Sequence, residues 1–302
     1  MRSLVRVIPV PLVVIFGLAL RPWTSPAVYA DSGSIKITAA GVTSEFPTGI
    51  RIRVEATGDN ELTSVAVRLR IGQRTSGSYD YLCQMGSFAS LEEGVCNPLE
   101  TGKLVDGELF WRTDTFGRFI PPGTIITYNF EVEDSTGARL ETDQEEFIYR
   151  DVRALRGKPL EWSEVSQGPV AVAYYGPVKS RAQIVLDTIL ETLDKMGPLL
   201  GADIETPIRV TMYNNNNDML GALPPGSTTI RRELITEGQA YAEEGVLLML
   251  GGGRTVRGTA SHEVMHILVH RAGDSVFRRV PSWLNEGLAE YFGPSQLVGS
   301  RR

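Results

Sequence analysis

The stretch that decides the fold of the second half of this chain is Ala260-Ser261-His262-Glu263-Val264-Met265-His266-Ile267-Leu268-Val269-His270-Arg271. Its apolar residues predict a helix buried in a core. His262 and His266 stand four residues apart. At about 3.6 residues per turn, both side chains project from one face and can hold a single ion. Glu263 lies on the flank of that face, where its carboxylate can reach a water molecule held by the ion. The spacing therefore predicts a metal site on this helix.

A third ligand is expected from outside this helix. His262, His266 and His270 are the only histidines of the chain. His270 lies a further turn along the helix axis, about 6 Å beyond His266, so it is poorly placed to reach the same ion. Catalytic zinc sites with two histidines take a carboxylate as the third protein ligand. The alternative is a pair of hydrogen-bonded core histidines without a metal.

The segment Ser282–Phe292 is predicted to form a second helix, closed at Gly293-Pro294. Glu286 and Glu290 are four residues apart and share one face of it. Glu286 is the expected third ligand, and Glu290 is expected to accept the free ring N–H of a ligating histidine. Gly287 removes bulk and is expected to let this helix approach the first. Two solvated surface carboxylates are the alternative.

These two motifs carry a family resemblance. His262-Glu263-x-x-His266 followed by Asn285-Glu286-Gly287-Leu288-Ala289 resembles the gluzincins, the clan of thermolysin and the aminopeptidase-N-like enzymes. The run Pro281–Tyr291 is most similar to the bacterial peptidase-MA-like group. The specific resemblance covers residues 259–292, and a weaker one begins near residue 170. It implies one zinc ion per chain, bound by His262, His266 and Glu286, and a metal-activated water that hydrolyses peptide bonds with Glu263 as general base.

The resemblance also implies a substrate-binding strand before the metal helix, which pairs with the substrate backbone. The best match is the segment Gly238, Gln239, Ala240 and Tyr241. Aminopeptidases of the clan carry a glutamate there that this segment lacks, so an endopeptidase is slightly favoured. The clan's oxyanion-stabilising residue comes well after the glutamate helix, whereas this chain stops at Arg302. A C-terminally truncated or minimal peptidase domain is therefore expected.

The region 31–150 is expected to be a β-sandwich. Ile50–Ala56 and Val65–Ile71 alternate strictly between apolar and polar residues, and Thr57–Asn60 is predicted to be a turn between them. Short strands with turn signals over such a length are typical of immunoglobulin-like or fibronectin-III-like domains. The region contains no histidine, so a positioning or adhesion role is expected. Further strands are predicted at Glu108–Arg112, Ile125–Glu133 and Glu145–Tyr149.

Cys83 and Cys96 are the only cysteines. In an exported protein they are candidates for a disulfide, with two free thiols as the alternative. They lie within Tyr79–Lys103, which fits no strand or helix period and is predicted to be a long loop.

Residues 151–168 are predicted to link the sandwich to an α+β metallopeptidase domain of zincin type at 169–302, so the whole chain is multidomain, β followed by α+β. In this domain the patterns predict strands, one helix and a polar loop. The strands are Val170–Tyr175, Ile208–Tyr213 and a hairpin from Gly238 to Leu250; the helix is Lys179–Met196, closed at Gly197-Pro198, and the loop is Asn214–Asp218.

The first thirty residues are expected to be a secretory signal. Arg2 and Arg6 precede a mostly apolar run, Val7–Leu20, and Val28-Tyr29-Ala30 supplies small residues at the cleavage-determining positions. Cleavage before Asp31 predicts a secreted or cell-surface protein with no stable membrane insertion. An uncleaved membrane anchor is the alternative.

The net charge of the chain limits the classes of partner that are expected. Removal of this leader, which carries three arginines and no acidic residue, takes the net charge from −6 to −9. An acidic protein without basic runs argues against nucleic acid and anionic membrane as partners. The expected partner is a peptide or protein substrate. The alternative function is an extracellular binding or adhesion protein whose metallopeptidase domain is inert or weakly active.

Overall fold

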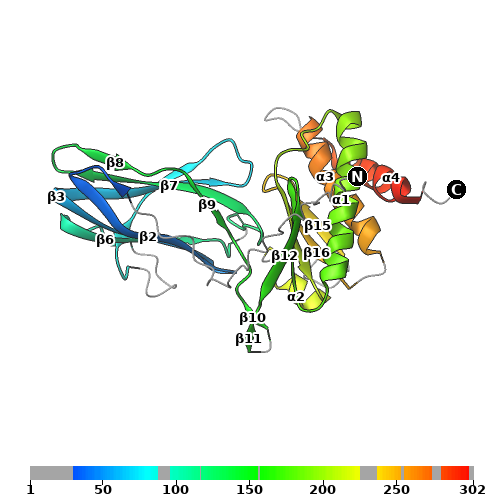
Figure 1. The fold of residues 1–302 in the computed structure, drawn as a ribbon, viewed down its shortest axis with the longest axis horizontal. Coiled ribbons are helices and arrows are strands. Elements are labelled where there is room, and N and C mark those ends of the chain that lie inside the picture. The colour runs from blue at the N-terminus through cyan, green and yellow to red at the C-terminus, as the bar shows by residue number, and fades with distance from the viewer. Residues whose placement is uncertain are drawn as a thin grey trace, which may run out of the picture.

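The computed structural model describes residues 30–87, 96–115, 117–155, 157–224, 237–252, 255–273 and 280–298. Within these ranges the strands form a nine-stranded sheet, a two-stranded hairpin and a five-stranded sheet. Figure 1 shows the β-rich part at one end, the helices at the other and the five-stranded sheet between them. No helix in the same ranges combines the length and the apolar character needed to cross a membrane. Except for Ala30, the predicted secretory signal lies outside the described residues.

One long strand, β3 (Gly49–Ile71), connects the two halves of the sandwich-like sheet. Its first half pairs with β2 (Ile35–Glu45) and β6 (Gly102–Arg112), and its second half pairs with β7 (Ile125–Asp134). The turn predicted at Thr57–Asn60 is therefore wrong. The register shifts there instead, and a strand that bends at a bulge can pass from one layer to the next.

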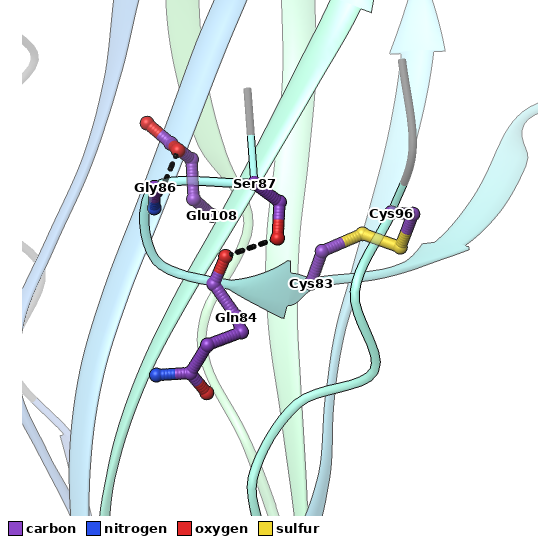
Figure 2. The surroundings of a disulfide bond; sticks show 6 residues. All are labelled: Cys83, Gln84, Gly86, Ser87, Cys96 and Glu108. Carbon is purple, nitrogen blue, oxygen red and sulfur yellow. Dashed lines mark hydrogen bonds between the residues drawn. A yellow bond between two sulfur atoms is a disulfide. The ribbon is translucent and has the colours of Figure 1, made fainter. Parts of the chain in front are cut away.

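The remaining strands of this sheet are short. They are β1 (Ala30–Asp31), β4 (Ser78–Tyr81), β5 (Cys83–Gln84), β8 (Arg139–Glu141) and β9 (Glu145–Ile148). Residues 79–103 were predicted to be one long loop, but this stretch contains most of β4, all of β5 and the start of β6. A disulfide joins Cys83 to Cys96, with their Cα atoms 5.4 Å apart (Figure 2). Beside it, the Gly86 N–H donates to Glu108 of β6 at 3.2 Å, which ties this segment to the sheet.

The predicted linker, residues 151–168, is partly a strand. After a hairpin of β10 (Ala154–Leu155) and β11 (Lys158–Pro159), β12 (Trp162–Gln167) pairs along its whole length with β13 (Val170–Tyr175). Trp162 and Val165 are the buried residues of β12. They are three positions apart, so the strand lacks the simple alternation that would have predicted it.

The five-stranded sheet has the order β12-β13-β14-β16-β15. Its central strands β13, β14 (Ile208–Tyr213) and β16 (Val246–Leu250) are parallel. The edge strands β12 and β15 (Gly238–Tyr241) are antiparallel to their neighbours. The predicted hairpin of β15 and β16 is confirmed, and among the described strands β15 is the edge strand that contacts α3.

Helices α1 (Lys179–Leu200) and α3 (Val256–Gly273) share an apolar core with one face of this sheet, and α4 (Ser282–Val298) packs on α3. The C-terminal ends predicted for α1 and α4 are wrong. The helix α1 continues through Gly197-Pro198 and ends at Leu200, and the following Gly201 caps it with a φ of 65°, the left-handed conformation. Helix α4 likewise continues through Gly293-Pro294. The predicted loop Asn214–Asp218 contains the start of α2 (Asn216–Leu220), capped by the Asn215 side chain.

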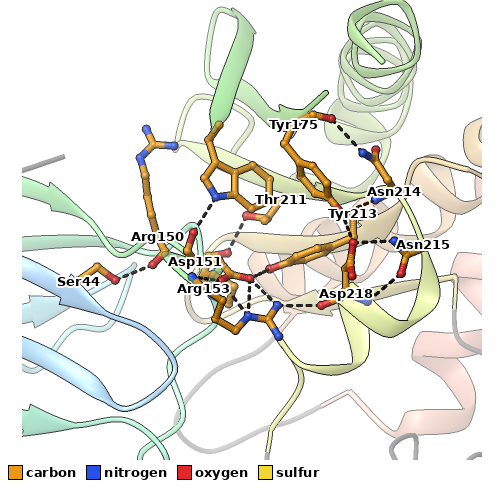
Figure 3. A network of polar contacts seen from close by, with 12 residues as sticks. Ser44, Arg150, Asp151, Arg153, Tyr175, Thr211, Tyr213, Asn214, Asn215 and Asp218 are labelled. Atoms are coloured by element: carbon orange, nitrogen blue, oxygen red, sulfur yellow. Dashed lines mark hydrogen bonds and ion pairs between the residues drawn. The ribbon is translucent and has the colours of Figure 1, made fainter. Parts of the chain in front are cut away.

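The other face of the five-stranded sheet packs on the sandwich. Its buried residues Tyr213, Val246 and Leu248 belong to the same hydrophobic core as the sandwich interior. The Thr211 hydroxyl donates to the Pro122 carbonyl at 2.8 Å. Figure 3 shows the junction, where buried Asp151 accepts from the Tyr213 hydroxyl at 2.8 Å and pairs with Arg153. The sheet is thus a middle layer between the sandwich and the helices.

Candidate metal centre

Helix α3 and helix α4 bring together three side chains of types that can ligate a metal ion. The Nε2 atoms of His262 and His266 lie 3.2 Å apart. Glu286 Oε2 is 3.6 Å from His262 Nε2 and 3.7 Å from His266 Nε2. A tetrahedral zinc ion with bonds of about 2.0–2.1 Å needs ligand atoms about 3.3 Å apart. The three side chains therefore fit such an ion with little movement.

The surroundings of His262 favour the neutral form of imidazole that a metal requires. Burial lowers the pKa of His262, and the neighbouring His266 lowers it further, against the opposing effect of Glu286 and Glu290. A neutral imidazole offers a nitrogen lone pair to a metal ion, whereas a protonated one does not. Glu286 supplies the negative charge, and its side chain is 65% exposed.

The second ring nitrogen of His266 has a hydrogen-bond partner, whereas that of His262 has a carboxylate nearby. His266 Nδ1 lies 3.0 Å from the Asn285 side-chain oxygen. Donation from Nδ1 to this oxygen leaves Nε2 free to bind a metal and holds the ring in place. Asn285 was not predicted as a functional residue, although it directly precedes Glu286. Glu290, predicted to accept from a histidine ring, lies 3.6 Å from His262 Nδ1 and is 80% exposed, so it is close to the ring but outside hydrogen-bond distance.

Glu263 is buried beside the two histidines and faces β15. A Cβ atom added to Gly238 would lie 2.6 Å from Glu263 Cγ, so only glycine leaves room for this carboxylate. The pKa of Glu263 is raised to about 8, mainly by burial and further by Glu286, while a hydrogen bond from the Ala240 N–H opposes the shift. A carboxyl group with a pKa near neutrality suits proton transfer.

Among the described residues, the edge of β15 opposite β16 pairs with no other strand, and it lines this site. Leu250 N donates to Glu237 O at 2.8 Å. In an antiparallel ladder every second residue bonds to the partner strand, so the backbone groups of Gly238 and Ala240 point away from β16. Together with the helices, this edge lines a cleft of about 410 Å³. The cleft contains Gly238, Gln239, Ala240, His262, Glu263, His266, Asn285 and Glu286.

Tyr241 belongs to the predicted substrate-binding segment, and its ring centroid lies 5.7 Å from that of Phe119 in the sandwich, because the pleat turns its side chain to the other face of the sheet. The prediction for Gly287 is wrong. Gly287, expected at the contact between the helices, has nothing within 4 Å of a Cβ added to it. Gly293 makes that contact instead: a Cβ there would lie 3.0 Å from His262 Cα.

No protein-family model matches this chain, and no curated protein matches it. A Niemann-Pick type C2 protein from Japanese carpenter ant is 14% identical over 40% of this chain and 98% of that protein, with a TM-score of 0.25. A polysaccharide deacetylase from Bacillus cereus is 9% identical over 63% and 53% of the two chains, with a TM-score of 0.23. A FixG-related protein from Vibrio parahaemolyticus is 13% identical over 41% and 96%, with a TM-score of 0.18. These likenesses are too weak to carry an argument about function.

Proposed function

We propose that this chain is an exported zinc-dependent peptidase of gluzincin type. In this proposal an immunoglobulin-like or fibronectin-III-like sandwich precedes a zincin domain, and an endopeptidase is favoured over an aminopeptidase. The observation that supports it is the meeting of His262, His266 and Glu286 beside buried Glu263. The free edge of β15 runs past the same point, so a peptide backbone has a place to bind.

In the proposed reaction, His262, His266 and Glu286 hold one zinc ion. When bound, zinc supplies Lewis acidity toward the scissile carbonyl and lowers the pKa of a water molecule. The Glu263 carboxylate takes the proton of the attacking water and passes it to the nitrogen of the leaving amine. A cation held close by lowers the pKa of Glu263 and favours the carboxylate that acts as base.

The substrate backbone is held by β15. The outward N–H and C=O groups of Gly238 and the C=O group of Ala240 can pair with a peptide as a further strand of the sheet. Because the Ala240 N–H approaches Glu263, the paired peptide is delivered next to the base.

The test is to purify residues 31–302, count zinc per chain by elemental analysis and compare casein cleavage by the parent and Glu263→Gln. We expect one zinc per chain in both proteins. Cleavage by the variant should fall by about 10²–10⁴-fold, the usual contribution of a general base. Zinc retained with no difference in cleavage between the two proteins would instead support the extracellular binding or adhesion protein. An absence of zinc from the parent contradicts the proposal.

A further inference from the structure

A second cavity lies in the sandwich, outside the metal cleft. It has a volume of about 340 Å³, and the residues that line it include the aromatic residues Trp111 and Phe119 and the apolar residues Ile71 and Leu109. Arg74 and Asp80 also line it. Aromatic walls of this kind favour another aromatic ring, which gains both apolar burial and edge-to-face contact.

Two consecutive residues of β15 contact this cavity and the metal cleft. Phe119, one of its walls, packs on Tyr241 with ring centroids 5.7 Å apart. The preceding residue, Ala240, directs its N–H to Glu263. Ala240, which faces Glu263, and Tyr241, which contacts Phe119 in the cavity wall, are therefore consecutive residues of β15.

The sandwich is held at a defined place beside this strand. Arg74 Nη2 lies 2.6 Å from Glu244 Oε1, and the Gln73 N–H donates to Glu243 O at 2.9 Å. Glu243 and Glu244 form the turn that joins β15 to β16. Arg74 also lines the cavity. The contacts that hold the sandwich on the sheet therefore also place the cavity next to the end of β15.

A peptide paired with β15 alternates its side chains between the two faces of the sheet. Side chains on the helix side enter the metal cleft, and those on the other side meet the sandwich at Phe119. We propose that the sandwich cavity is a subsite for an aromatic side chain of the peptide substrate, close in sequence to the bond that is cleaved. This inference rests on the proposed peptidase function, and it gives the sandwich a direct part in substrate selection.

The experiment compares cleavage of a peptide library, in which aromatic residues and alanine are exchanged at each position, by the zinc-loaded parent, Trp111→Ala and Phe119→Ala. A pocket of this kind is expected to favour an aromatic residue over alanine by about tenfold or more in kcat/KM. Both variants should reduce that ratio at one position to nearly 1, because cleavage of the aromatic peptide falls more than cleavage of the alanine peptide. The matched control is Tyr81→Ala, which removes an exposed aromatic ring of the sandwich that does not line the cavity and should keep the preference.

Zinc content and thermal unfolding show whether each variant is folded. If Trp111→Ala or Phe119→Ala unfolds, Phe119→Leu keeps an apolar side chain while it removes the aromatic ring, and it should still weaken the preference. Cleavage by the parent without an aromatic preference, or folded variants that keep the preference, overturns the subsite alone. A zinc-loaded parent that cleaves no peptide overturns the proposed function and the subsite together.

Discussion

Gly293 of α4 lies directly against the backbone of His262 on α3. A Cβ atom added to Gly293 would be 3.0 Å from both the Cα and the N atom of His262. The Ser261 hydroxyl donates to the Gly293 carbonyl at 2.6 Å and lies 3.2 Å from the Thr192 hydroxyl of α1. A close backbone contact and a buried hydrogen bond thus fix α4 on α3. This contact sets the distance from Glu286 to the two histidines.

We therefore expect Gly293→Ala to weaken zinc binding by about tenfold or more, the effect usually seen when the support of a ligand is disturbed. The added methyl group cannot fit beside His262 unless α4 moves, and Glu286 moves with it. The measurement is zinc affinity by competition with a chelator, together with circular dichroism to verify helix content.

Gly287→Ala is the matched control. It makes the same change on the same helix at a position with open space around it. It should leave zinc affinity unchanged and stabilise the helix by about 0.5–1 kcal/mol. Equal zinc affinities for the two variants would show that the contact at Gly293 does not position the third ligand.

The roles proposed for Asn285, Glu286 and Glu290 of α4 predict that substitutions at these residues lower zinc affinity by different amounts. Asn285→Ala removes the partner of His266 Nδ1 and should lower zinc affinity by about 10–100-fold. Glu286→Gln removes a ligand and its charge, so it should cost more than Asn285→Ala. Glu290→Gln should cost least, because its carboxylate is exposed and 3.6 Å from His262. Zinc titrations of the three variants check the order, and a larger loss for Glu290→Gln than for Glu286→Gln contradicts the assignment of the third ligand.

The sequence predicts the parts of the site that depend on local spacing. The helical repeat places His262 and His266 on one face, and the second motif places Glu286 on a helix, as the structure has them. It does not reveal that Gly293 rather than Gly287 meets α3, because that depends on how α4 is rotated and on its continuation past Pro294. The same rotation brings Asn285 to His266. These contacts follow from packing between helices, which no pattern within one segment contains.

The fold of the sandwich and its place on the sheet could also be predicted only in part from the sequence. Alternation predicts most strands, but it does not show that β3 is continuous between its two halves. Nor does it show that the sandwich covers one face of the five-stranded sheet. The apolar residues on both faces of a central parallel strand such as Val246–Leu250 require two covering layers. Only the structure identifies the second layer as the sandwich, through contacts such as Thr211 with Pro122.

The acid stability of the sandwich is expected to depend on Asp134. Hydrogen bonds from the Thr136 hydroxyl and the Asn60 amide lower its pKa from 3.8 to about 2. The folded state therefore holds the carboxylate more strongly than the unfolded state does, and the stabilisation is present above pH 4. As the pH falls from about 4 to 2, the unfolded state takes up the proton first and stability is lost. Urea unfolding from pH 6 to pH 2 should show a smaller loss for Asp134→Asn than for the parent, and identical pH profiles contradict this assignment.

The packing of the sheet on the sandwich predicts that residues 151–302 do not fold alone. Without the sandwich, the core side chains Tyr213, Val246 and Leu248 lose a covering layer. Exposure of one such side chain costs about 1.5–3 kcal/mol, and the whole stability of a domain is typically about 5–15 kcal/mol.

The fragment 151–302 should bind a hydrophobic dye and unfold without a cooperative transition, whereas residues 31–302 should unfold cooperatively. The fragment Asp31–Arg150 serves as the comparison, since most side chains of the shared core belong to it. A fragment 151–302 that unfolds cooperatively and binds one zinc would show that the two parts are independent, and the sandwich would then be free to act as a separate module.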